Sequence, residues 1–277
     1  MIPAPFDYVR ADSADAALAA LGEHGDEAKL LAGGQSLLPL MKLRLAMPTV
    51  VVDVSRAGEL AYVRADGAVL AIGATTRHCD VARSADVLTH APLLAHAASG
   101  VGDPQVRHRG TIGGSVAHAD PSADLPTALL ALGATYVIRG PSGTREVPAA
   151  EFSTGFLESV LAPDELLVEI RLPSAAGEAW GYEKFTRRAI DWATVAVAVQ
   201  ARGGETAVAL GNMGSTVLRA TATEAALAGG ADAAAAASHA ADGTEPSSDV
   251  TASSEFRRHL ARVLTRRALT AAGSMAG

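Results

Sequence analysis

Cysteine is nearly absent from this chain of 277 residues, because Cys79 is the only one. An internal disulfide is therefore impossible, and an iron–sulfur cluster, which needs about four cysteine thiolates, would have to be carried by another chain. Aromatic residues make up only 4% of the sequence while 49% is hydrophobic, so the chain can still bury a substantial core. We expect Cys79 to be a buried hydrophobic side chain.

Excess basic charge and long apolar runs are lacking too. The formal net charge is -7, which provides no cationic field to attract nucleic acid or anionic lipid. No run approaches the roughly 20 apolar residues of a membrane span, and the N-terminal residues lack the pattern of a signal peptide. We therefore expect a cytoplasmic protein with no integral membrane segment and no nucleic-acid partner.

The spacing of apolar and turn-forming residues changes twice along the chain. It first predicts a helix ending at Gly22, followed by short strands and paired glycines, which is typical of a small α/β unit. Short strands with turn signals come next, interrupted by helical stretches such as residues 80–98. In the last part, two strands are joined through Gly203-Gly204 and helices follow. We predict three domains, at residues 1–56, 57–173 and 174–277.

The first informative motif places paired glycines, Gly33-Gly34, between a strand and a helix expected at residues 36–45. Glycine lets a backbone approach a ligand closely, and free N–H groups at a helix start favour a phosphate. The spacing matches neither a P-loop nor a Rossmann fingerprint. Taken alone, such a turn is more often structural than functional.

Paired glycines recur at Gly113-Gly114, flanked by the hydroxyls of Thr111 and Ser115. Two glycine-and-hydroxyl turns in separate domains could hold the two phosphates of one dinucleotide between them. The residues alone leave dinucleotide binding and a purely structural role as equal alternatives.

A spacing that suggests a metal site occurs at His118, Asp120 and Asp124, but a simpler interpretation fits better. Asp120 begins a sequence typical of a turn, and an acidic residue such as Asp124 suits the first turn of a helix. Residues 107–109 are either a small anion site or a solvated basic loop. We predict no metal site and no catalytic residue in this chain.

Two long segments carry a family resemblance: AGGQSLLPLMKLRL at residues 32–45 and GDPQVRHRGTIGGSVAHADPSADLP at residues 102–126. They resemble the FAD-binding signatures of the medium subunits of the carbon monoxide dehydrogenase and xanthine dehydrogenase family, the molybdenum hydroxylases. The likeness continues at residues 181–193 and 257–269. It implies a PCMH-type FAD-binding fold of class α+β, with a small parallel α/β domain, a domain with an antiparallel sheet, and a C-terminal three-stranded sheet with helices.

The resemblance also implies which residues bind FAD. In the first turn they are Leu30, Leu31, Ala32, Gly33, Gly34, Gln35, Ser36 and Leu37. In the second turn they are Thr111, Ile112, Gly113, Gly114 and Ser115. The remaining matches are the single positions Val101, Asp124, Leu166, Lys184 and Trp192.

Two residues depart from the pattern of many family members, which have histidine in the first turn and asparagine at the end of the second. This chain has Gln35 and Ser115 at these positions. Both side chains still form hydrogen bonds, so we expect FAD binding to be kept while contacts to the flavin and its potential change.

The implied function is that of an electron-transfer subunit. Its FAD would take electrons from the [2Fe-2S] clusters of a small subunit, fed by a large molybdopterin subunit, and pass them to an external electron acceptor. The family further implies a dimer of such heterotrimers and, most often, carbon monoxide as the substrate. Two alternatives remain open at this point: a self-contained FAD-dependent oxidase or reductase, and an assembly subunit that has lost FAD.

Overall fold

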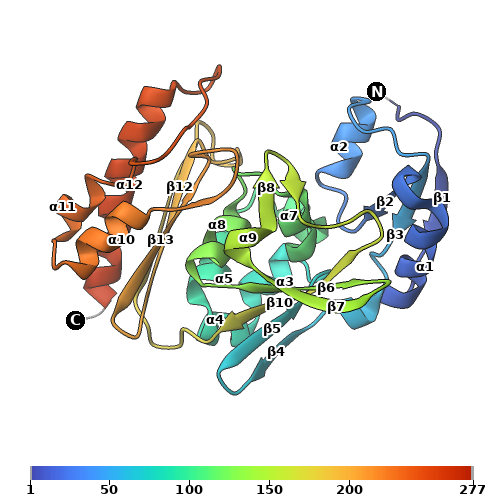
Figure 1. Cartoon of the computed structure of the whole chain (residues 1–277), viewed down its shortest axis with the longest axis horizontal. Coiled ribbons are helices and arrows are strands. Elements are labelled where there is room, and N and C mark those ends of the chain that lie inside the picture. The colour runs from blue at the N-terminus through green and yellow to red at the C-terminus, as the bar shows by residue number, and fades with distance from the viewer. Residues whose placement is uncertain (1, 276–277) are drawn as a thin grey trace.

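The computed structural model describes residues 2–275, and Figure 1 shows three units side by side, with the N-terminal and C-terminal units flanking the central one. The main sheet of each unit falls within one of the three predicted domains, whose boundaries stay predictions. The ends of the outer predicted domains, residues 1 and 276–277, lie outside the described residues. The predicted α+β class, with a parallel sheet first and an antiparallel sheet second, is confirmed.

The first unit is a small three-stranded parallel sheet in the order β1-β3-β2, covered by helices. Helix α1 begins after Ser13, whose side chain accepts a hydrogen bond from the amide of Ala16 at 3.1 Å. It continues past Gly22, where we expected it to stop, and ends at Gly25, which has a φ of 52°. The elements of this unit are β1 (Asp7–Arg10), α1 (Ala14–His24), η1 (Gly25–Glu27), β2 (Ala28–Leu31), α2 (Leu37–Lys42) and β3 (Val50–Asp53).

The second unit is built on a five-stranded antiparallel sheet in the order β4-β5-β10-β6-β7. Its strands and short turns are η2 (Gly58–Leu60), β4 (Val63–Asp66), β5 (Val69–Gly73), β6 (Thr135–Gly140), β7 (Gly143–Pro148), β8 (Ser153–Gly155), β9 (Glu158–Ser159) and β10 (Leu166–Pro173). Its helices are α3 (His78–Arg83), α4 (Ala85–His90), α5 (Pro92–Ser99), α6 (Pro104–Arg109), α7 (Ile112–His118), α8 (Asp124–Ala131) and α9 (Ala149–Phe152). Helices α5 and α8 supply much of its aliphatic core.

The predicted helical stretch at residues 80–98 is three helices rather than one. Ser84 ends α3 and caps α4 by accepting a hydrogen bond from the amide of Val87. Pro92, which has no N–H to give, begins α5. The second predicted turn is also more regular than expected, because Gly113 and Gly114 lie in the first turn of α7.

The third unit has three long antiparallel strands and a short edge strand, in the order β11-β12-β13-β14. The hairpin predicted at Gly203-Gly204 is confirmed, and both glycines have positive φ, as a tight turn of this kind requires. Helix α12 packs on the sheet, and Gly181 allows this approach because a Cβ there would collide with the carbonyl oxygen of Ala268. The elements are β11 (Trp180–Phe185), β12 (Val195–Arg202), β13 (Glu205–Gly211), β14 (Leu218–Arg219), α10 (Thr221–Ala228), α11 (Ala233–Ala237) and α12 (Ser254–Met275).

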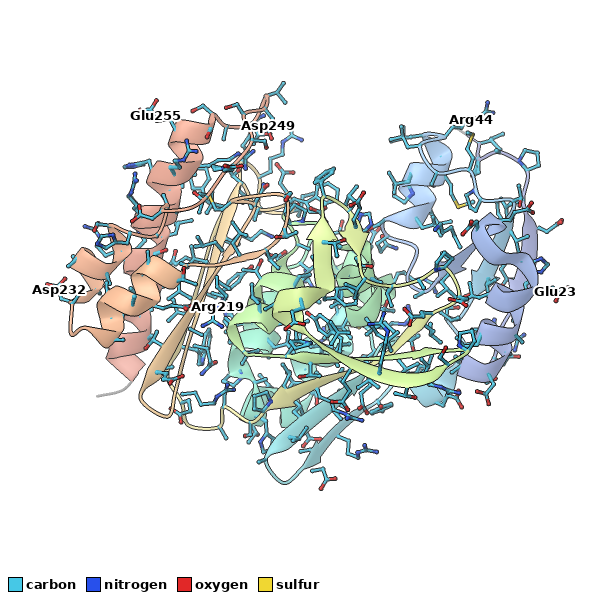
Figure 2. All side chains as sticks on the ribbon, in the orientation of Figure 1. Glu23, Arg44, Arg219, Asp232, Asp249 and Glu255 are labelled. Atoms are coloured by element: carbon cyan, nitrogen blue, oxygen red, sulfur yellow. The ribbon has the colours of Figure 1, made fainter. Side chains whose placement is uncertain are left out.

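The outer units therefore stand on either side of the central one. In Figure 2 the labelled Arg44 and Asp249 mark the first and the third unit, with the central unit between them. Within residues 2–275, none of the helices combines the length and the apolar character that a membrane span requires.

Candidate functional site

A cavity of about 830 Å³ is bordered by residues from all three units. Its volume falls in the range of roughly 300–1,000 Å³ that is usual for sites of small molecules and cofactors. Every predicted cofactor-binding residue except Ile112 lines it: Leu30, Leu31, Ala32, Gly33, Gly34, Gln35, Ser36, Leu37, Val101, Thr111, Gly113, Gly114, Ser115, Asp124, Leu166, Lys184 and Trp192. The fold thus brings together residues that lie far apart in the sequence.

Ile112 is the exception, and its place in the core explains why. Its side chain is completely buried among the aliphatic residues of the second unit. Its amide donates to the carbonyl oxygen of Thr76 at 3.0 Å, so the backbone is engaged as well. Ile112 therefore supports the second turn from behind and does not face the cavity.

The first glycine turn presents a run of unpaired backbone donors. Among the hydrogen bonds of the described residues, none is donated by the amides of residues 32–37. Gly34 has a φ of 75°, a conformation that L side chains rarely adopt, and this lets the chain turn from β2 into α2. Buried or half-buried amides need partners, so this segment is suited to bind an anionic group in the cavity.

Gly33 has a different task from its neighbour. A Cβ on Gly33 would collide with the carbonyl oxygen of Arg109 and with Gly110. Glycine is therefore required here because the first turn packs directly against the segment that leads into the second turn. This contact joins the first and second units at the cavity.

In the second glycine turn, most of the amides already form hydrogen bonds within the protein. Gly113 donates to the carbonyl oxygen of Ala74 at 2.8 Å, and a Cβ on Gly113 would collide with the same residue. The side chain of Thr111 caps α7 by accepting from the amide of Gly114 at 3.2 Å. Gly114 itself is exposed, and apart from that Thr111 hydroxyl its Cβ position is open. Space for a ligand is thus the main contribution of Gly114.

An ion pair from two different units borders the cavity. The ammonium of Lys184 on β11 lies 2.9 Å from a carboxylate oxygen of Asp124 at the start of α8. Only 13% of the Lys184 side chain and 7% of the Asp124 side chain are exposed. Tyr182 donates to the second carboxylate oxygen at 2.6 Å, and burial, with the Asp124 charge, raises the pKa of the Tyr182 phenol well above its usual value.

Trp192 stands at the rim, on the segment that connects β11 to β12. The residue is 71% exposed, although it borders the cavity. The backbone after it is held from two sides: Asn212 donates to the carbonyl oxygen of Ala193, and buried Arg257 donates to that of Thr194. An exposed indole on an anchored backbone can cover a flat ring or contact a partner protein.

Two polar residues beside the cavity were not predicted from the sequence. Thr75 Oγ1 and His78 Nδ1 are buried and have no hydrogen-bond partner among the described residues. Burial, together with the Arg107 charge, lowers the pKa of His78 to about 4, so its ring is neutral at pH 7. The only signal in the sequence was their place in and just after the segment that leads from β5 to α3.

The residues suspected of metal binding have ordinary structural partners. The Asp120 carboxylate accepts from the amide and the hydroxyl of Ser122, which confirms the predicted turn. Asp124 lies in the first turn of α8, as expected. Within residues 2–275, no three side chains of His, Cys, Asp or Glu are grouped closely enough to hold a metal ion.

Two family models match the chain one after the other. Residues 4–175 match the FAD binding domain in molybdopterin dehydrogenase, and residues 180–272 match the CO dehydrogenase flavoprotein C-terminal domain. The carbon monoxide dehydrogenase medium chain of Hydrogenophaga pseudoflava is 43% identical over 98% of both chains. The 6-hydroxypseudooxynicotine dehydrogenase complex subunit alpha of Paenarthrobacter nicotinovorans is 38% identical over 98% of this chain and 96% of its own length.

The solved structures give a similar result. A structure of carbon monoxide dehydrogenase from Hydrogenophaga pseudoflava, which lacks the Mo-pyranopterin moiety of its cofactor, contains a chain with a TM-score of 0.96. That chain is 44% identical, and the match covers 99% of both chains. The likeness therefore extends over all three units.

Proposed function

The chain belongs to the family of FAD-binding domains in molybdopterin dehydrogenases, and we propose that it relays electrons between an iron–sulfur partner and an external acceptor. It is an FAD-binding medium subunit of an oxidoreductase of the molybdenum hydroxylase type. The observation that carries the proposal is the cavity shared by all three units, with a run of unpaired amides on one side.

The residues present fit FAD on structural grounds. The unpaired amides of residues 32–37 suit the diphosphate, because backbone N–H groups bind phosphate oxygens well. The open space at Gly114 lets the ligand approach the second turn, and the orphaned hydroxyl of Thr75 offers a further polar group. Gln35 donates to the carbonyl oxygen of Gly33 at 3.3 Å, so its side chain shapes the first turn.

When bound, FAD supplies the redox chemistry, taking up electrons from a partner's [2Fe-2S] clusters and giving them to the acceptor. The protein's own contribution is position and charge. The two turns fix one end of the ligand, while Lys184 brings a cation to the cavity from the third unit. Trp192 covers the rim, where a partner or an acceptor can reach the site.

We further propose that the chain assembles with a small [2Fe-2S] subunit and a large molybdopterin subunit, as a dimer of heterotrimers in the cytoplasm. With Cys79 as the only cysteine, this chain cannot carry such a cluster itself. Carbon monoxide is the proposed substrate of the complex, because the 43% identical relative is the medium chain of a carbon monoxide dehydrogenase. The relative named for a nicotine derivative gives the competing assignment.

Anaerobic mixing tests the proposal directly. Carbon monoxide and 6-hydroxypseudooxynicotine are each mixed with the isolated FAD-loaded chain and with the reconstituted complex, while flavin absorbance is followed. We expect bleaching by carbon monoxide only when both partners are present. Equal bleaching rates for the isolated chain would favour a self-contained flavoenzyme, and bleaching of the complex by the nicotine derivative alone would replace the substrate.

A further inference from the structure

The buried carboxylate of Asp124 is held by two side chains of a single strand. Tyr182 and Lys184 are two residues apart on β11, so both side chains leave the same face of the strand. Tyr182 reaches one oxygen of Asp124 at 2.6 Å and Lys184 reaches the other at 2.9 Å. Because Asp124 lies on α8 of the second unit, these two bonds connect the second and third units at the cavity.

The strand that carries both side chains has a fixed place. On one side, Gly181 lies against the backbone of Ala268 on α12 without room for a side chain. On the other side, the ring of His96 on α5 lies 5.3 Å from the ring of Trp180 and 5.7 Å from that of Tyr182, measured between centroids. The phenol of Tyr182 is therefore locked in position before any ligand binds.

A count of hydrogen bonds shows which group remains available to a ligand. Both oxygens of Asp124 are occupied, one by a neutral phenol and one by a cation. The ammonium of Lys184 has three N–H groups, and besides Asp124 its one acceptor among the described residues is the carbonyl oxygen of Gly100, at the long distance of 3.5 Å. Lys184 thus keeps donor capacity for the cavity that it lines.

We propose that Tyr182 is a positioning residue for the cofactor: by holding Asp124, it keeps the Lys184 ammonium turned toward a carbonyl or anionic group of bound FAD. This inference rests on the proposed function. It also makes the seating of the third unit part of FAD binding, because the phenol and the ammonium come from the same strand.

Removal of the Tyr182 hydroxyl has a consequence that follows from this geometry. One oxygen of Asp124 loses its partner inside a nearly closed site, where an unpaired charge is costly. The ammonium of Lys184 already donates to the other oxygen at 2.9 Å, so we expect it to turn to serve both oxygens and to withdraw from the cavity. Withdrawal of this cation leaves the cavity less positive, which makes electron uptake there less favourable.

The test compares Tyr182→Phe with a matched control in the full-length chain. Tyr8 donates to the carboxylate of Asp53 at 2.7 Å, on the surface of the first unit, so Tyr8→Phe removes the same kind of bond at an exposed site. Apo protein is titrated with FAD and flavin fluorescence is followed, and the midpoint potential of the bound flavin is measured by equilibration with a redox dye. The thermal midpoint of each apo chain reports on folding.

We expect Tyr182→Phe to raise the Kd for FAD about tenfold, in line with the loss of one hydrogen bond to a charged group, and to lower the flavin potential. Tyr8→Phe should change neither. The apo midpoint should fall by no more than about 5 °C. In a Lys184→Met background, the additional Tyr182→Phe change should have less than about a twofold effect, because the group it positions is gone.

Each of the following results would overturn the inference. The first is an unchanged Kd and potential in Tyr182→Phe while the wild-type chain binds FAD normally. The second is that Tyr182→Phe weakens FAD binding as much in the Lys184→Met background as in the wild-type chain, which means that Tyr182 acts only on folding. An unfolded apo Tyr182→Phe chain means the same. A wild-type chain that binds no FAD would instead overturn the proposed function, and this inference with it.

Discussion

The two glycine turns border one cavity and contain the same dipeptide, but they use their backbones in opposite ways. At the first turn, the amides of residues 32–37 have no partner among the described residues. At the second, the amides of Ile112, Gly113 and Gly114 already donate to Thr76, Ala74 and Thr111. The first turn therefore supplies donors to a ligand, whereas the second supplies a rigid wall with one open position.

The largest expected effect tests the donors of the first turn. If these amides bind the diphosphate, the chain should bind riboflavin, which has no phosphate, about a thousandfold more weakly than FAD, because two charge-assisted hydrogen bonds are lost. FMN should fall between them. Calorimetric titration of the apo chain with the three flavins measures the series. Similar affinities for riboflavin and FAD would mean that the amides serve another purpose.

The next prediction tests whether the second turn is a rigid wall of the cavity. Gly113→Val should lower the free energy of unfolding by about 3 kcal/mol, because the added side chain has to displace the backbone of Ala74. Urea unfolding of the apo protein measures this loss. Gly58→Val is the control, since a Cβ at Gly58 meets nothing within 4 Å and its φ is not positive. Equal losses in the two variants would refute a special role for Gly113.

A third substitution separates binding from folding within the same dipeptide. Gly114→Val should weaken FAD binding about a hundredfold, since the branched side chain fills the space of the ligand. Its apo stability should fall less than that of Gly113→Val, because only the Thr111 hydroxyl has to move. Fluorescence titration and urea unfolding, done on both variants, give the contrast. If stability and affinity fall in parallel in the two, the distinction between them is wrong.

The smallest expected effect uses pH. His78 supports the second turn, since its amide donates to the carbonyl oxygen of Gly110 at 2.9 Å and its ring packs on Gly110. Burial lowers the pKa of His78 from 6.5 to about 4, so between these values the unfolded chain binds a proton that the folded chain does not. This group therefore has no effect above about pH 6.5 and costs about 2 kcal/mol at pH 5.

His78→Gln removes this titration. The free energy of unfolding in urea should therefore fall between pH 7 and pH 5 by about 2 kcal/mol more in the wild-type chain than in the variant. Parallel pH profiles would show that the buried ring does not control the acid sensitivity of the second turn.

Much of the site could be predicted from the sequence, because each turn is a short segment whose glycines and hydroxyls are visible in the sequence itself. Gly34 is such a case, because its positive φ is a property of the turn alone. The different roles of the individual glycines could not be predicted in this way. Gly113 is required because Ala74 packs against it, and Gly33 because Arg109 does, and both neighbours are far away in the sequence. The buried side chain of Ile112 could not be recognised for the same reason: a motif says which residues are near a site, and packing decides which side chain faces it.

Helix boundaries, too, were predicted only approximately from the sequence. Gly22 was expected to end the first helix, yet Gly25 has the positive φ that ends it. The bond between Tyr182 and Asp124 spans 58 positions, and no periodicity in the sequence reports it. The pairing of β12 with β13, in contrast, is a local feature marked by the glycine pair between the two strands, so this hairpin was predictable.

The direct contact of Gly33 with Arg109 and Gly110 has a consequence for recombination. A chimera that takes the first unit from one relative and the rest from another has to preserve this backbone-to-backbone fit, although no side chain takes part in it. The apolar side chains that the two units bury together, including Val137 and Leu166 of the second unit, have to be kept as well. One added methyl group at position 33 would push the amides of the first turn away from the second turn, so the exchange would fail even if every other contact between the units were kept.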